Sequence, residues 1–100
     1  MKQARFHRSA RAELEQAVDY YERLRSGLGL DLQTEVEAAV RRIEQNPHGG
    51  APYKSTRFRY RIVRRFPYIV FYRELEDAIW IVAVAHGKRR PDYWSRRRVP

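Results

Sequence analysis

The chain has 100 residues, of which 43% are hydrophobic and 13 are aromatic, enough for one modest core and too few for two. It has no cysteine, which excludes a disulfide framework and a thiolate metal site. Its longest apolar run, Ala78 to Ala85, is far shorter than the roughly 20 residues that span a bilayer, and its first residues lack the apolar core of a secretory signal. We therefore expect one cytoplasmic domain, residues 1–100, with no cofactor and no metal site.

The net charge of +9 is confined to the second half of the chain. Residues 1–50 carry 8 Lys/Arg and 8 Asp/Glu, whereas residues 51–100 carry 13 and 4. No acidic residue lies between Glu44 and Glu74, and 18 of the 21 basic residues are arginine, whose planar guanidinium suits phosphate and carboxylate. A solvated basic surface would not explain the balanced first half, so the asymmetry favours contact with nucleic acid or an acidic protein.

Two helices are expected after a short, edge-like strand over residues 2–7. Ser9 is a typical N-cap for the first helix, which ends before Gly27. The second helix runs from about residue 30 to the residues before Pro47, and its short connection to the first predicts an antiparallel pair. The residues expected to face a sheet are Ala10, Leu14, Ala17, Val18, Tyr21 and Leu24 in the first helix and Leu32, Val36, Ala39, Val40 and Ile43 in the second.

Three strands are expected in the second half, over residues 57–62, 68–72 and 78–86, as an antiparallel meander. In the first of these, apolar and basic residues alternate, and we expect the apolar face to meet the helices. Arg57, Arg59 and Arg61 would then project from the far face, together with Trp80 and Val82 of the last strand, where Ile79, Ile81, Ala83 and Ala85 share the other face. This far face would be part basic and part apolar, and either the C-terminal segment or a partner should cover it.

The expected fold class is therefore α+β, in the order β-α-α-β-β-β, with a short C-terminal helix or tail and an antiparallel sheet packed on a helical hairpin. Several segments, spread over about ninety residues, carry a further resemblance: Ala-Glu-Leu-Glu-Gln-Ala at 12–17, Tyr20-Tyr21-Glu22, Gly27-Leu28-Gly29, Asn46-Pro47, Phe-Pro-Tyr-Ile-Val-Phe-Tyr at 66–72, and Val-Ala-His-Gly-Lys-Arg-Arg-Pro-Asp-Tyr-Trp at 84–94. In this order they resemble the RelE/ParE superfamily of small bacterial toxins from type II toxin-antitoxin modules.

The resemblance implies one of two activities. RelE-like toxins cut messenger RNA on the ribosome, and ParE-like toxins inhibit DNA gyrase. Both are neutralised by an antitoxin, here a ParD-like or RelB-like acidic protein, whose C-terminal segment wraps the toxin and forms a hetero-oligomer with it.

RNA cleavage needs a proton acceptor, a proton donor and cations for the charge that develops on phosphate. By resemblance, Arg61 and Arg89 would be the phosphate-stabilising pair, with Lys54 and Lys88 as further candidates. His86 could serve as acid or base, or could instead be a strand-end histidine bonded to the backbone. The tyrosine expected six residues after Arg89 is absent, and Tyr93 comes four residues after it, across Pro91.

Gyrase inhibition needs only a binding surface, and the runs at 68–72 and 85–94 look closer to ParE-like members. We therefore favour the ParE-like interpretation, in which the chain is not an enzyme. Aromatic and arginine side chains dominate interface energetics, although Tyr93 and Trp94 could equally pack on the sheet. A stand-alone nucleic-acid-binding module is a third possibility. The expected target or antitoxin contacts are Arg59, Arg61, Trp80, Lys88, Arg89, Arg90, Tyr93, Trp94 and Arg97.

Overall fold

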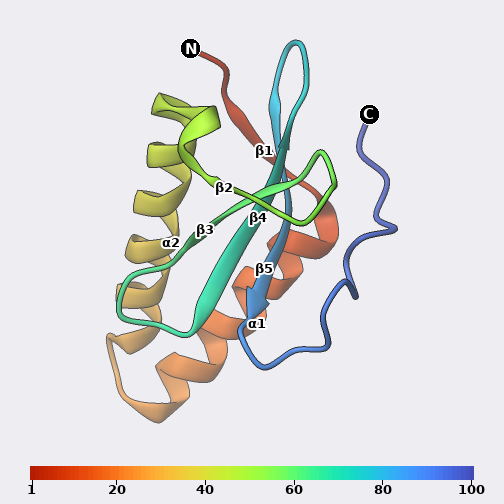
Figure 1. Cartoon of the computed structure of the whole chain (residues 1–100). Helices are drawn as coiled ribbons and strands as arrows, with labels where there is room; N and C mark the ends of the chain where they lie inside the picture. Colours follow the sequence, from red (N-terminus) through yellow and green to blue (C-terminus); the bar gives the residue numbers. More distant parts are fainter.

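The computed structural model describes all residues, 1–100 (Figure 1). One strand, two helices and a three-stranded meander follow in the expected order, with two short additions after the second helix. The elements are β1 (Ala4–Phe6), α1 (Arg8–Leu24), α2 (Leu28–Gln45), the 3-10 helix η1 (Pro47–Gly49), β2 (Ala51–Pro52), β3 (Arg59–Ile62), β4 (Tyr68–Glu74) and β5 (Ile79–His86). The α+β class is confirmed. Neither long helix has the apolar length required to cross a membrane.

The five strands form one sheet in the order β1-β5-β4-β3-β2. The meander β3-β4-β5 is antiparallel, as expected, but β1 pairs with β5 in parallel, with Ala4 opposite Ile79. The sheet is therefore mixed, whereas the sequence predicted antiparallel pairing throughout. The reason lies in the connection: α2 returns the chain to the end of the sheet where β1 begins, so β3 and β5 run in the direction of β1 (Figure 1).

The helices α1 and α2 pack as an antiparallel pair on one face of the sheet (Figure 1). The expected apolar stripe of α2 is buried there, while Leu24 of α1 is 59% exposed and lies outside the core. The two helices approach closely at Gly29, where an added Cβ would lie 2.4 Å from the carbonyl oxygen of Val18. Only glycine allows this approach.

The N-cap of α1 is His7, not the predicted Ser9. Its Nδ1 accepts a hydrogen bond from the Ser9 backbone N–H at 3.0 Å. Burial, followed by the charge of nearby Arg97, lowers the pKa of His7. This shift favours the neutral ring that an accepting nitrogen requires. His7 is therefore a capping residue and not a solvent-facing strand residue.

Strand β5 contains a bulge that breaks the predicted alternation. Ile81 and Ala83 pair with Tyr72 and Phe71, which are neighbours in β4, so Val82 is an extra residue between two rungs. Beyond this bulge the side chains of β5 alternate in the opposite phase. The prediction that Ile79, Ile81, Ala83 and Ala85 share one face is therefore wrong. The residues toward the helices are Ile79, Ile81 and Val84, and those on the far face are Trp80, Val82, Ala83 and Ala85.

The side chains of β3 face opposite to the prediction. Tyr60 packs in the apolar cluster of the far face, whereas Arg59 and Arg61 are paired with core residues beneath the helices. Both arginines are half-buried there, and Arg59 Nη1 donates to the carbonyl of Gly50 at 2.9 Å. Alternation determines which residues share a face but not which face is covered.

The far face of the sheet is covered by the C-terminal segment, residues 87–100, which runs along the side away from the helices (Figure 1). Trp94 is 2% exposed and stacks on Phe71 with 4.4 Å between ring centroids. The rings of Tyr53 and Phe58 pack beside it. Of the two coverings that the sequence allowed, the chain's own segment therefore occupies much of this face, through turns and not through a helix.

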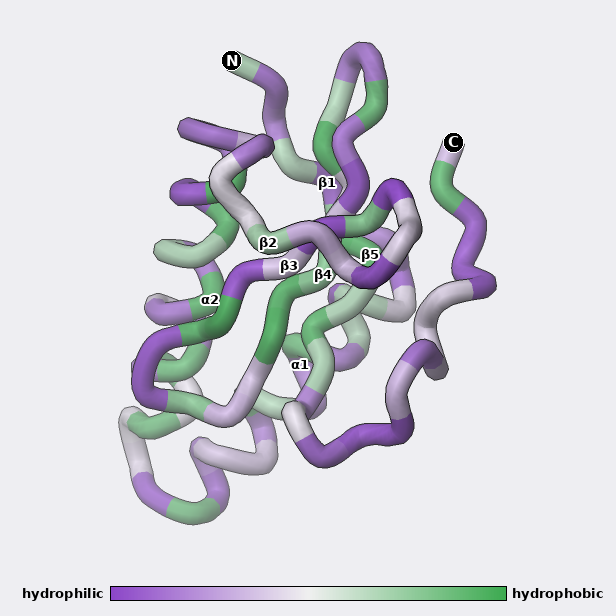
Figure 2. The backbone as a smooth tube through the Cα atoms, viewed as in Figure 1, coloured by the Kyte–Doolittle hydropathy of each residue, from purple (hydrophilic) through white to green (hydrophobic).

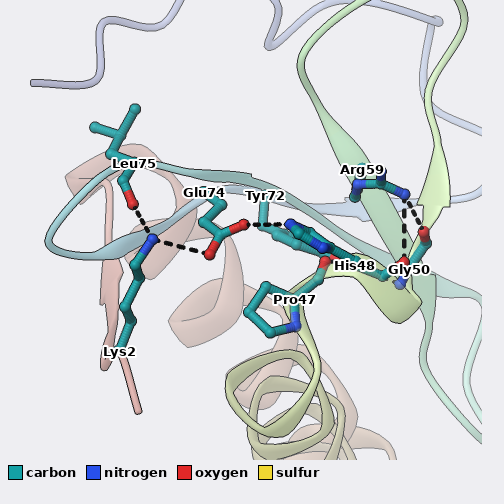
Figure 3. Close-up of polar contacts among 8 residues, drawn as sticks. All are labelled: Lys2, Pro47, His48, Gly50, Arg59, Tyr72, Glu74 and Leu75. Carbon is teal, nitrogen blue, oxygen red and sulfur yellow. Dashed lines mark hydrogen bonds and ion pairs between the residues drawn. The ribbon is translucent and has the colours of Figure 1, made fainter.

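Glu74, near the end of β4, joins the N-terminus to η1 (Figure 3). One carboxylate oxygen accepts from Lys2 Nζ at 2.9 Å, and the other meets His48 Nε2 at the same distance. Lys2, through its hydrogen bond, is the largest cause of the lowered pKa of Glu74, and His48 contributes in the same direction. The imidazole of His48 therefore interacts with the Glu74 carboxylate of the same chain.

The hydroxyl of Tyr72 holds the connection between α2 and β3 through hydrogen bonds to its backbone (Figure 3). The hydroxyl donates to the carbonyl of Pro47 at 2.5 Å and accepts from the backbone N–H of Gly50 at 3.2 Å. The side chain is fully buried. Removing the hydroxyl would leave both backbone groups without this partner.

Tyr72→Phe should lower the free energy of unfolding by about 1–3 kcal/mol, because it leaves buried backbone groups unpaired. Urea unfolding followed by circular dichroism measures the change. Tyr20→Phe is the matched control, since Tyr20 is 57% exposed, and should change stability by less than about 0.5 kcal/mol. Equal effects of the two substitutions would contradict the structural role of the Tyr72 hydroxyl.

Candidate functional site

Strand β5 ends in a basic turn, Gly87–Arg90, which Figure 2 shows as a hydrophilic stretch after the apolar strand. The backbone N–H of Gly87 donates to the carbonyl of Pro67 at 2.8 Å. The N–H of Lys88 donates to His86 Nδ1, and the N–H of Arg89 donates to the carbonyl of His86, both at 3.0 Å. Its three cationic side chains are exposed. The backbone bonds fix the turn, so it presents three cations from rigid support.

A cavity of about 180 Å³ separates the basic turn from the far face of the sheet. Its floor is apolar, and Arg89 and Arg90 contribute cationic groups to its lining. Such a cavity fits an apolar side chain with carboxylates beside it. The lining residues are Tyr53, Ile69, Phe71, Ala85, His86, Gly87, Arg89, Arg90, Pro91, Asp92, Tyr93 and Trp94.

Glu13 of α1 anchors the C-terminal segment. Its Oε2 accepts from the Tyr93 hydroxyl at 2.5 Å and from Arg97 Nη2 at 2.8 Å, and its Oε1 accepts from Arg97 Nη1 at 3.0 Å. The same two side chains also serve the backbone near the bulge: Oε1 accepts from the N–H of Val84 at 3.0 Å, and Arg97 Nη1 donates to the carbonyl of Val82 at 2.8 Å. The side chains of Glu13 and Arg97 are only 13% and 18% exposed. This bidentate, largely desolvated pair is of the strong kind.

The same carboxylate contributes to the pKa shifts of its partners. Burial, then the hydrogen bond to Glu13 and its charge, raises the pKa of Tyr93. The hydrogen bond to Glu13 also raises the pKa of Arg97. Tyr93 is therefore a protonated phenol at neutral pH, with its hydrogen directed at Glu13 and the Arg89 guanidinium 3.9 Å from its ring centroid.

A second clamp closes the C-terminal segment against the loop before β3. Asp92 accepts from the Tyr53 hydroxyl and from Lys54 Nζ, the latter at 2.9 Å. The hydrogen bonds from Tyr53 and Lys54 lower the pKa of Asp92. Lys54 therefore forms an ion pair with Asp92 of the same chain. No group of three or more His, Asp or Glu side chains is placed to hold a metal ion.

Comparison with known proteins shows the family of this chain. The family model described as the ParE toxin of the type II toxin-antitoxin system, parDE, matches residues 4–91. The chain belongs to the ParE toxin family. It is 40% identical over 57 residues to Toxin ParE2 of Mycobacterium tuberculosis, and this match spans 57% of the chain and 53% of that protein, about half the length of the relative.

A solved structure of a ParE-containing system has the same fold. A chain of the chromosomal ParDE TA system from P. aeruginosa superposes with a TM-score of 0.77. The likeness covers 86% of this chain and 96% of that chain at 22% sequence identity. The shared fold is thus maintained by a sequence that has largely diverged.

In this ParE family member, the residues predicted for RNA cleavage do not meet in one place. Arg61 lies against η1, where an added Cβ on Gly49 would be 2.5 Å from its Nη2. Arg89 lies over Tyr93, beyond the end of β5. Five cavities indent the surface, and none of them is lined by both arginines. His86 uses Nδ1 to accept from the backbone, which is the structural role that the sequence left open.

The predicted contact residues fall into two groups. Trp94 and Arg97 are engaged within the ParE chain, Trp80 is half-buried on the far face, and Arg59 bonds backbone carbonyls. Those with exposed cationic groups that form no ion pair are Lys88, Arg89 and Arg90. Sequence reasoning missed Glu13. Its only sequence signal is its place in the Ala-Glu-Leu-Glu-Gln-Ala run, where it looks like any other helix-surface acid.

Glu13→Ala should lower the free energy of unfolding by about 1–3 kcal/mol, because Arg97 and the Val84 N–H lose their shared acceptor. Glu15→Ala is the matched control, on the exposed side of the same helix turn, and should change stability by less than about 0.5 kcal/mol. Hydrogen exchange of residues 87–100 should quicken only in the first variant. Unchanged exchange there would contradict the anchoring role.

Stability should decline in alkali partly through Tyr93. Since the folded chain raises the pKa of this phenol above the ordinary value of 10.0, its stabilisation is complete below that pH and declines as the pH rises from there toward the pKa of the folded phenol. Tyr93→Phe should therefore show a smaller loss of unfolding free energy than wild type between about pH 9 and 11. Identical slopes in the two proteins would contradict the burial of the neutral phenol.

Proposed function

We propose that this chain is the toxin of a type II toxin-antitoxin module, that it inhibits DNA gyrase in the cytoplasm, and that an acidic, ParD-like antitoxin neutralises it. The observation that carries the proposal is the match of the ParE toxin model to residues 4–91. The exposed basic turn beside an apolar cavity supports a function exercised by binding.

The geometry of the basic turn suits inhibition of a large target. Its backbone is fixed by three hydrogen bonds, so little conformational entropy is lost when Lys88, Arg89 and Arg90 engage a partner. Exposed arginines and an adjoining apolar cavity combine the two features that give interfaces their affinity. We assign the target contact to this turn.

The antitoxin contact follows from charge and from the cavity. A chain with a net charge of +9 attracts an acidic partner over a distance, which raises the association rate. The cavity of about 180 Å³ accepts one apolar side chain, and Arg89 and Arg90 can pair with carboxylates on either side of it. A partner seated there would cover the basic turn, and so neutralisation and target binding would exclude one another.

RNA cleavage on the ribosome is the alternative, and two observations argue against it. Arg61 and Arg89 lie in different parts of the molecule, and Tyr93 gives its hydroxyl hydrogen to Glu13. A phenol held in this way is neither a free base nor a free acid. The proposed inhibitor requires no such group.

Purified toxin should inhibit supercoiling of relaxed plasmid by DNA gyrase and leave translated messenger RNA intact. Replacing Lys88, Arg89 and Arg90 by alanine should weaken the inhibition by about 10-fold or more, because several interface cations are removed together. The matched control replaces Arg5, Arg23 and Arg25, three exposed arginines that line none of the cavities beside the turn, and removes the same charge. Its inhibition should stay near that of wild type.

The opposite pattern of results would refute the proposal. If the protein leaves supercoiling untouched and cuts ribosome-bound message, with loss of cleavage in Arg61→Ala and in Arg89→Ala, the chain acts as a RelE-like nuclease. If the control variant loses as much inhibition as the turn variant, the effect is one of net charge and the basic turn does not bind the target.

A further inference from the structure

A second cavity lies between α1 and the end of β5, on the face of the sheet that the helices cover (Figure 1). Its volume is about 250 Å³, and we name it the tyrosine pocket. Arg89 of the basic turn lines both this pocket and the cavity on the far face. The polar and aromatic side chains of its lining are Glu13, Gln16, Tyr20, Tyr68, His86 and Arg89.

A row of aromatic rings holds one wall of the tyrosine pocket. Tyr68 and His86 are opposite each other in β4 and β5, with ring centroids 5.2 Å apart and ring planes at 81°. Tyr21 packs edge-to-face on both Tyr20 and Tyr68, at 5.2 Å and 6.2 Å. Its ring also meets Phe66 of the core at 5.2 Å. These contacts restrict the rings before any partner arrives, so binding there costs little conformational entropy.

The one carboxylate in the tyrosine pocket has no capacity left for a ligand. Both oxygens of Glu13 accept two hydrogen bonds each, from Tyr93, Val84 and both terminal nitrogens of Arg97. These four bonds fill the acceptor sites of a carboxylate. The charge of Glu13 is paired with that of Arg97 at 2.8 Å. The pocket therefore offers a ligand no unused carboxylate.

The remaining polar groups of the lining can donate hydrogen bonds. Nδ1 of His86 accepts from the Lys88 N–H at 3.0 Å, so the imidazole carries its hydrogen on Nε2. Burial, followed by the charges of Tyr21 and Tyr20, raises the pKa of Tyr68, so its phenol keeps a hydrogen to donate. Arg89 adds a guanidinium that forms no ion pair within the chain. This set of donors fits an anionic group with acceptor oxygens.

The rest of the lining favours a peptide over nucleic acid. A phosphate backbone is bound mostly by several arginine and lysine side chains, whereas Arg89 is the single cation here. Ala17 and Val84 are buried and provide an apolar floor. Gln16 is exposed, and its amide can both donate to and accept from a peptide backbone. Tyrosine and arginine are also the side chains that contribute most to protein interfaces.

We propose that the tyrosine pocket is a docking site for an acidic peptide segment of a protein partner. A carboxylate of that segment binds the donors of Tyr68, His86 and Arg89, and an apolar side chain beside it rests on the floor. Because Arg89 lines cavities on both faces of the sheet, a segment that continues around the end of β5 would contact the basic turn from two sides. The docking site does not depend on gyrase being the target.

Nuclear magnetic resonance of the isotope-labelled full chain locates the binding directly. The probe is a peptide of three Glu-Leu-Ala-Glu repeats, and its control has glutamine in place of every glutamate. The acidic peptide should shift the amide signals of Gln16, Ala17, Tyr20, Tyr68 and His86. The glutamine peptide should bind about 10-fold more weakly or less, because it lacks the charge that Arg89 attracts.

Tyr20→Ala tests the pocket without disturbing the core, because this side chain is 57% exposed. The variant should bind the acidic peptide about fivefold more weakly or less, as expected when an interface tyrosine is removed. Leu24→Ala is the matched control: Leu24 lies one turn further along α1, is 59% exposed and lines none of the five cavities. Its affinity should stay near that of wild type.

Three results would overturn the docking site. The first is no binding of the acidic peptide, or shifts confined to the basic turn and the far-face cavity. The second is equal affinity of Tyr20→Ala and Leu24→Ala. The third is a DNA duplex that displaces the peptide from the pocket and shifts the same signals more strongly, since the occupant would then be nucleic acid. The measurement contains no gyrase, so a chain that binds the peptide as described but leaves supercoiling untouched would refute the proposed function alone.

Discussion

The ion pair between Glu13 and Arg97 connects the three parts of this molecule. It ties the C-terminal segment to α1, and each side chain also bonds a backbone group beside the bulge in β5. A largely buried pair contributes to stability only when its remaining donors and acceptors are satisfied, and here they bond Tyr93 and the strand. Because this network holds the segment on the sheet, the basic turn becomes a closed connection with both ends fixed, and the cavity beneath it acquires its second wall.

Periodicity was sufficient to predict most of the fold. The stripes of α1 and α2, the stop at Pro47 and the meander follow from local spacing, and the structure confirms them except for the exposed Leu24. The direction of β1, the bulge at Val82 and the facing of β3 could not be predicted in this way. Each depends on pairing or burial between distant segments, and alternation alone is symmetric with respect to the two faces of a sheet.

The residues of the candidate site likewise include some whose position the sequence predicts and others whose position it does not. The exposure of Lys88, Arg89 and Arg90 follows from a basic run after a strand, and the sequence named all three among the expected contacts. The roles of Trp94 and Arg97 were not decided by the sequence, because an interface residue and a packing residue of these types look alike until the fold is known. Glu13 and Arg97 are 84 residues apart, and nothing in the local sequence of either one indicates the other.

The burial of Trp94 provides the most direct measurement of the central claim, that the C-terminal segment is part of the folded domain. Trp80→Phe leaves Trp94 as the single tryptophan. With Trp94 at 2% exposed, that variant should show blue-shifted emission and weak quenching by acrylamide, and both should change toward the values of free tryptophan when Glu13→Ala is added. Red-shifted, strongly quenched emission in the Trp80→Phe protein itself would contradict the account.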